Sequence, residues 1–183
     1  MTSAAASVAR LSSPAELAAA VPYLCGYVPD EALVVLALRG PRGRLGLTQA
    51  CPLPPPDVAV VVAGQALQRV RAVGAQAACA LLYTRDPGPR AHPDLVLAVQ
   101  QAARRWSVDL RDLLLVRDAR CWSALCDDPV CCPPEGRPVP SASAGLSLLQ
   151  AQSAAQGRAV LASRAALADS LAPCGLPAEA SAR

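Results

Sequence analysis

The order of apolar and polar positions along the chain predicts alternating helices and strands. Apolar residues recur every three or four positions from Val58 to Val73 and again from Leu95 to Trp106, which predicts two amphipathic helices. Because Gly40 to Gly43 separate the first two strand-like runs, these runs should form a hairpin with a five-residue loop. Continuous or alternating apolar runs predict five strands, at 31–38, at 44–52, at 77–84 and two within 111–125.

Capping and turn residues predict where these elements begin and end. The segment from Ser13 to Glu16 has the spacing of a capping box, and the helix it begins is expected to end near Pro22. Asp57 is the expected N-cap of the next helix. The last two strands meet at Asp118 and Ala119, where Ala disfavours the positive φ of a tight turn, so a looser bend is expected.

Together these elements predict an α/β fold with three layers. The expected sheet is mixed, centrally parallel and five-stranded, with helices on both sides, and its second, third and fourth strands run parallel through right-handed crossovers. Two small-residue amphipathic segments then predict a C-terminal helical pair, with Ser163 as a cap and Pro173 as the stop. We expect a mixed α/β domain over 1–140 that ends in a Cys/Pro-rich loop, and a C-terminal helical appendage and tail over 141–183.

The composition provides for one core and gives little reason to expect a nucleic-acid partner. With 183 residues, 53% of them hydrophobic, the chain can bury a core of its own. All 17 basic residues are Arg and the net charge is only +3, a pattern that, with abundant Ala, Pro and Gly, is typical of GC-rich coding sequence. Two Trp, three Tyr and no Phe provide no stacking platform for single-stranded nucleic acid.

The sequence also predicts the compartment. Pro, Gly or charged residues interrupt every apolar run before it reaches the roughly 20 residues of a membrane helix. The first residues lack the basic and apolar regions of a signal peptide. We therefore expect a cytoplasmic protein with no membrane partner, in which the eight cysteines are buried thiols, metal ligands or reactive groups rather than a disulfide framework.

The expected topology points to one candidate ligand site. Open sheets with parallel strands bind ligands at the carboxyl ends of those strands. Two Arg side chains among carboxylates at that edge suit an anionic small molecule, and the alternative is a solvated edge with local ion pairs. The residues expected there are Asp30, Thr84, Arg85, Asp86, Arg117 and Asp118.

A second candidate site is the stretch CWSALCDDPVCCPPEG, residues 121–136. Cys121 and Cys126 would lie about 16 Å apart along a strand, so they cannot share one metal ion. This leaves three candidate zinc ligands, Cys126, Cys131 and Cys132. A fourth ligand would come from Cys79, Cys174, Asp127 or Asp128.

Two other roles are possible for the same three thiols. A disulfide from Cys126 to Cys131 or Cys132 would serve as a redox switch, because a reducing cytoplasm disfavours a permanent bond. Alternatively, the thiols pack as small hydrophobes that hold a proline-rich loop against the sheet. A nucleophilic cysteine would need a base, and His92 is expected at the opposite edge of the sheet.

Three segments together resemble a known family: SPAELAAAVPYLCGYVPDEALVVLALRG, WSALCDDPVCCPPEGRP and LASRAALADSLAP. They are similar to a family of high-GC bacteria, the domain of unknown function numbered 4192, over about 13–173. Members tend to carry His in the loop before the first strand and Asp-Ser at its start, where this chain has Val28, Glu31 and Ala32. The family has no established activity, so the resemblance implies no mechanism.

These observations favour a non-catalytic binding or interaction module whose cysteine loop is structural or holds zinc. One alternative is an enzyme that acts on an anionic small molecule at the carboxyl-end edge of the sheet, and another is a thiol-based redox sensor. The expected partner is another protein or a second copy, bound through the C-terminal helices.

Overall fold

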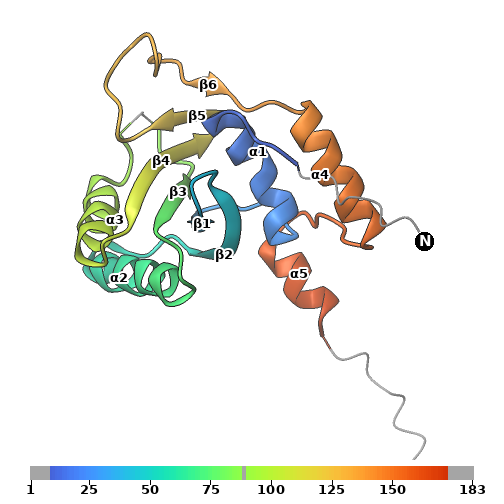
Figure 1. The fold of residues 1–183 in the computed structure, drawn as a ribbon, viewed down its shortest axis with the longest axis horizontal. Coiled ribbons are helices and arrows are strands. Elements are labelled where there is room, and N and C mark those ends of the chain that lie inside the picture. Colours follow the sequence, from blue (N-terminus) through green and yellow to red (C-terminus); the bar gives the residue numbers. More distant parts are fainter. Residues whose placement is uncertain (1–8, 88–89, 173–183) are drawn as a thin grey trace, which may run out of the picture.

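The computed structural model describes residues 9–87 and 90–172, which form one mixed sheet with helices on both faces (Figure 1). The strands are β1 (Ala32–Arg39), β2 (Arg44–Pro52), β3 (Ala77–Tyr83), β4 (Asp109–Arg117), β5 (Arg120–Ser123) and β6 (Arg137–Pro138). The helices are α1 (Pro14–Cys25), α2 (Pro56–Ala72), α3 (Pro93–Arg105), α4 (Ala144–Ala155) and α5 (Arg164–Ser170). The predicted α/β class is confirmed, but the sheet has six strands rather than five. The extra strand, β6, is two residues long and contains Pro138, so the pattern of apolar residues does not predict it.

The strand order is β2-β1-β3-β4-β5-β6, and it corrects the prediction of a centrally parallel sheet. Strands β2, β3 and β4 share one direction as expected, but β1 lies between β2 and β3 and pairs antiparallel with both. Among the described strands, only β3 and β4 pair in parallel. The reason lies in burial: residues 32–37 of β1 are buried throughout, whereas the first three residues of β2 are exposed, as an edge strand tolerates.

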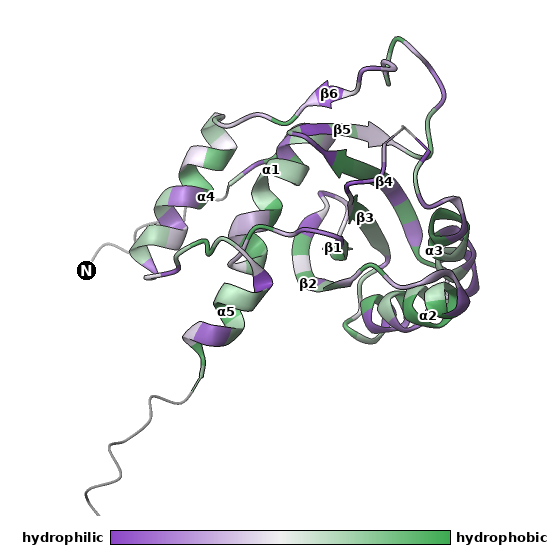
Figure 2. Cartoon of the chain, turned by 180° about the vertical axis from the view of Figure 1, so that it is seen from behind, coloured by the Kyte–Doolittle hydropathy of each residue, from purple (hydrophilic) through white to green (hydrophobic). Residues whose placement is uncertain are grey.

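Alternate residues of each central strand face different helices, which creates two apolar layers. Ala80 and Leu82 of β3 pack in the layer under α2 and α3, whereas Leu81 and Tyr83 pack in the layer under α1. Figure 2 shows the apolar central strands between these helices. The sheet is thus covered on both faces, as three-layer folds require.

Helix α1 continues past the expected stop at Pro22 and ends at Cys25, where Gly26 forms the C-cap with φ 78°. Proline has no N–H, so it leaves the carbonyl of Ala18, four residues earlier, without its helical donor. The hydroxyl of Tyr83 donates to that carbonyl at 2.9 Å. A residue of β3 therefore replaces the missing bond, and the helix gains one more turn.

Three other local predictions are wrong. The β4–β5 turn is a tight two-residue turn, with φ 48° at Asp118 and 54° at Ala119, because the paired strands impose the positive φ that a primed turn needs. Helix α2 begins at Pro56, so Pro55 rather than Asp57 is its N-cap residue. The β1–β2 loop has four residues, 40–43, because Arg39 still pairs with Arg44.

The two C-terminal helices form, but the predicted pairing between them does not. Helix α4 lies beside α1, where the amide of Gln150 donates to the Tyr23 hydroxyl at 2.8 Å. Helix α5 lies apart from α4, beyond the end of α1 (Figure 1), and has no buried residue. Ser163 caps α5 as predicted, and Pro173 lies outside the described residues. Among the described residues, no helix has the length and apolar character needed to cross a membrane.

Candidate functional site

The structure brings the predicted ligand residues together at one edge of the sheet, which we call the rim. The backbone N–H of Thr84 donates to Val116 at 3.1 Å, joining the ends of β3 and β4. Five of the six predicted residues line a cavity of about 710 Å³, namely Asp30, Thr84, Arg85, Arg117 and Asp118. The sixth, Asp86, contacts the rim through its carbonyl, which accepts a hydrogen bond from Arg117.

The other wall of this rim cavity comes from helices that the sequence analysis did not associate with it. Tyr23 of α1 and Leu146 and Gln150 of α4 line the cavity opposite the strand ends. Leu146 is 1% exposed, so α4 is anchored there by apolar burial. No periodicity in the sequence signals this wall, because it depends on how α4 packs against α1.

The charges of the rim are largely satisfied within the protein. Arg85 forms an ion pair with Asp30, and its backbone N–H donates to Glu31. Arg117 contacts Asp118 at 3.4 Å as well as the carbonyl of Asp86. Since each Arg already has an oxygen partner, an anion would have to compete with these contacts.

A polar triad lies at the same edge, formed by the predicted rim residues Thr84 and Asp86 and by His92, which was also expected at this edge; no pattern in the sequence indicated the hydrogen bonds that join them. The Thr84 hydroxyl and His92 Nε2 are 2.7 Å apart and share a hydrogen bond, and the Asp86 N–H donates to that hydroxyl at 3.0 Å. The Asp86 carboxylate lies 3.6 Å from His92 Nε2. His92 adopts a left-handed backbone with φ 54°, so the contact with Thr84 holds a conformation that non-glycine residues rarely adopt.

Replacing Thr84 tests this triad. Thr84 is 6% exposed, so Thr84→Val leaves the Asp86 N–H and His92 without their buried partner, and we expect the free energy of unfolding to fall by about 1 to 2 kcal/mol. The matched control, Thr84→Ser, keeps the hydroxyl and should lose less than about 1 kcal/mol, the value of one methyl group. Urea unfolding measures both. An unchanged free energy of unfolding in Thr84→Val would show that the hydroxyl contributes nothing.

The cysteine loop, residues 124–136, connects β5 to β6 and covers one flank of the sheet. It begins where Ala124 N–H donates to Leu113 at 2.7 Å, and it reaches Arg90, which pairs with Asp127 at 3.0 Å. The loop was expected to stay at the edge opposite the rim. Instead it extends along α3 toward the residues that precede that helix, because β5 is only four residues long and the loop must return to pair β6 with β5.

Three thiols in this loop lie close together, and we call them the thiol cluster. The sulfur atoms of Cys126, Cys131 and Cys132 all lie within 4.8 Å of one another. As expected, Cys121 is not among them: it is buried in β5 under α1. Cys126 follows β5 instead of ending it, because the strand stops at Ser123.

Hydrogen bonds to main-chain groups fix the shape of the loop around the cluster. The N–H of Cys132 donates to the Asp128 carbonyl at 2.7 Å, and the N–H of Val130 donates to the Asp128 carboxylate at 2.8 Å. Arg137 donates to the Cys131 carbonyl at 2.6 Å. These bonds hold the turn that carries Cys131 and Cys132, and the Cys126 sulfur approaches theirs from the segment that follows β5.

The thiol environments differ in a way that separates the cluster from the buried cysteines. Burial together with the neighbouring Cys126 and Cys131 thiols raises the pKa of Cys132 to about 12. Burial alone is the main reason that the pKa of Cys79 rises to about 11. Cys79 lies within β3 and does not join the cluster, so it is not the fourth ligand that the sequence allowed for.

The other candidate fourth ligands are engaged elsewhere or lie outside the described residues. Asp127 pairs with Arg90, and Asp128 accepts from Val130. Cys174 falls outside the described residues. Within residues 9–87 and 90–172, the set of Cys, His, Asp and Glu groups gathered here therefore numbers three.

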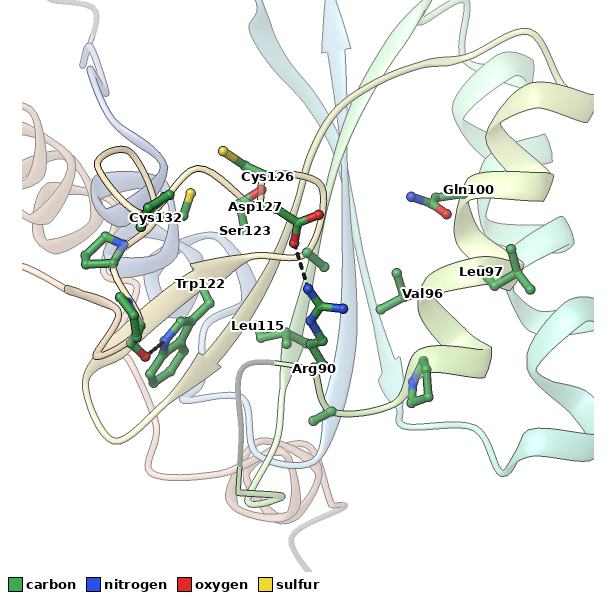
Figure 3. Close-up of a pocket in the computed structure, with 16 residues that line it drawn as sticks. Arg90, Val96, Leu97, Gln100, Leu115, Trp122, Ser123, Cys126, Asp127 and Cys132 are labelled. Atoms are coloured by element: carbon green, nitrogen blue, oxygen red, sulfur yellow. Dashed lines mark hydrogen bonds and ion pairs between the residues drawn. The ribbon is translucent and has the colours of Figure 1, made fainter.

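A groove of about 410 Å³ separates the cysteine loop from α3, and Cys126 and Cys132 line it (Figure 3). Val96, Leu97 and Gln100 of α3 form one wall, and Trp122 lies on the opposite side in Figure 3. The Trp122 indole N–H donates to the Pro134 carbonyl at 2.9 Å, and Arg117 stacks over its ring at 5.0 Å. The ring is thus held from both sides.

The fold and its two candidate sites define the class of this protein: a mixed α/β domain with a charged rim and a three-thiol loop. The chain belongs to the family described as Domain of unknown function (DUF4192), whose model matches residues 14–183. The matched region includes the rim and the cysteine loop, and it confirms the family resemblance found in the sequence. A comparison with curated proteins finds no match.

Proposed function

We propose that this protein is a cytoplasmic, non-catalytic binding module whose cysteine loop holds a zinc ion. The observation that carries the proposal is the approach of three sulfur atoms to within 4.8 Å of one another. Zinc binds thiolate sulfur at about 2.3 Å, which places the sulfurs of a tetrahedral site about 3.8 Å apart. Small side-chain rotations would bring Cys126, Cys131 and Cys132 to that spacing.

The chemistry of the loop supports zinc over packing alone. Cys131 is exposed, and the other two cluster cysteines are only partly buried, whereas cysteines that act as small hydrophobes are generally buried. The three thiols converge near the surface of the loop, where a metal ion can reach them. A metal ion would join two parts of a loop that has little secondary structure of its own.

The rim is the second candidate site, and it concerns binding of a small molecule rather than zinc. Its cavity has the size of a small-molecule site, but Arg85 and Arg117 are already paired with oxygen atoms of the rim. The enzyme alternative therefore stays a prediction. Self-association also stays a prediction, and because α4 is packed against α1, it would now involve α5.

Metal content tests the zinc site. We expect the full chain, purified in reductant without chelator, to hold about one equivalent of zinc, because a metal site that contributes to folding is nearly filled. Cys132→Ser should lower this below about half an equivalent. The control is Cys51→Ser: the Cys51 thiol donates to the Leu33 carbonyl at 3.8 Å and packs against the core, outside the cluster, and the variant should keep its zinc. Elemental analysis measures all three proteins.

Two results would overturn the proposal. A parent protein with less than about half an equivalent of zinc would leave the thiols without a metal role, because metal bound by a folded structural site resists removal. If thiol counting then showed a disulfide within the cluster in the absence of reductant, the redox-sensor hypothesis would replace the zinc proposal. Equal zinc in the parent and in Cys132→Ser would place the metal elsewhere.

A further inference from the structure

Within the part of the chain that the structure describes, the thiol cluster supplies three ligands, and a tetrahedral zinc ion takes four. Sites with three protein ligands keep the fourth position for a water molecule or an exogenous ligand, whereas four-ligand sites are closed. The carboxylates of Asp127 and Asp128 are the nearest candidates along the chain, and each already has a partner. The following inference rests on the proposed zinc site and concerns what fills that fourth position.

The groove beside the cluster indicates the size and polarity of the ligand. Cys126 and Cys132 line its end, so a metal held by them would be reached from the groove. Its volume of about 410 Å³ lies within the range of small-molecule sites. Val96, Leu97, Leu115 and Trp122 give it a continuous set of apolar side chains.

The charges around the groove disfavour a strongly anionic body for that ligand. Arg90 is the cation that lines the groove, and Asp127 neutralises it at 3.0 Å. A carboxylate or phosphate placed beside Leu115 and Trp122 would lose water there and find no further cation among the lining residues, which is unfavourable. An apolar or aromatic body avoids that cost and gains contact with the Trp122 ring.

The metal itself selects the donor atom. Zinc is a borderline-soft ion, and four-thiolate sites are among its common structural forms. A thiol that enters the fourth position binds as its thiolate: the S–H bond breaks, the sulfur donates to zinc and the proton goes to solvent. No oxidant or reductant is needed for this exchange.

We propose that the groove between α3 and the cysteine loop binds a small thiol with an apolar body, whose sulfur completes the zinc site. The thiol cluster and the Trp122 side of the groove thus act on two parts of one ligand. Gln100 and the Arg90–Asp127 pair also line the groove and provide for a small polar group on that body, with Asp127 directly beside Cys126.

Cobalt substitution of the full chain tests this, because the ligand-field and thiolate charge-transfer absorption of Co²⁺ reports the number of sulfur ligands. We expect phenylmethanethiol to intensify the thiolate band in a saturable way, at a concentration about tenfold lower than 2-mercaptoethanol requires, since its ring buries additional apolar area. Leu97→Arg is the matched variant, because Leu97 is 51% exposed and its replacement leaves the core intact. It should remove the tenfold preference while 2-mercaptoethanol binds as before.

The outcomes separate this inference from the zinc proposal. If Co²⁺ does not bind, the proposed function itself is wrong. If Co²⁺ binds but neither thiol changes the spectrum, the site is closed and this inference alone is overturned. It is also overturned if both thiols bind equally well, or if a cysteine-containing peptide of apolar sequence binds more tightly than phenylmethanethiol, which would make the groove a protein-docking site.

Discussion

Gly136→Ala should lower the free energy of unfolding by about 2 to 5 kcal/mol, measured by urea denaturation in reductant and chelator. Gly136 has φ 76°, which alone disfavours a side chain. In addition, a Cβ at this position would lie 2.4 Å from Cε2 of Trp122. The ring cannot turn away easily, because its N–H is bonded to Pro134 and Arg117 stacks over it.

Gly157→Ala is the matched control for this substitution. Gly157 has φ 68°, similar to Gly136, but a Cβ there would meet no atom within 4 Å. It should therefore show only the cost of the left-handed backbone, about 1 to 2 kcal/mol. Similar losses at both positions would mean that the contact between the loop and Trp122 does not limit the stability of the protein.

Gly145→Ala should destabilise the protein by about 2 to 3 kcal/mol, although alanine is the better helix former. Gly145 lies in the first turn of α4, and a Cβ there would lie 2.1 Å from the carbonyl oxygen of Arg10. A main-chain oxygen cannot rotate away as a side chain can, so either α4 or the segment before α1 must move. Urea denaturation measures the loss, and hydrogen exchange should show α4 less protected.

Gly64→Ala should change the free energy of unfolding in the opposite direction. Gly64 lies within α2, and a Cβ there would meet no atom within 4 Å. Alanine should therefore stabilise the protein by about 0.5 to 1 kcal/mol, through helix propensity alone. If Gly145→Ala were also stabilising, α4 would not be docked against the segment that contains Arg10.

The candidate sites were predictable to the extent that they depend on neighbours in the chain. Thr84 and Arg117 follow or end buried strands, so their meeting at one edge of the sheet follows from strand direction. The thiol cluster was predictable because Cys121 lies within a strand, which sets it apart from the three cysteines of the loop that follows. The wall formed by α4 and the groove beside α3 were not predictable, since both depend on where a loop or helix packs after it leaves the sheet.

The sequence by itself determined the class of fold, the number of long helices and strands, and the residues of the rim and the cysteine loop. These depend on apolar period and on spacing along the chain, which are local properties. Only the tertiary structure decided that β1 lies between β2 and β3, that α1 continues through Pro22 and that Ala119 adopts a positive φ. In each case the deciding contact is made by a residue that the chain brings from another element, such as the Tyr83 hydroxyl at the Ala18 carbonyl, and its hydrogen bond or burial outweighs the local preference.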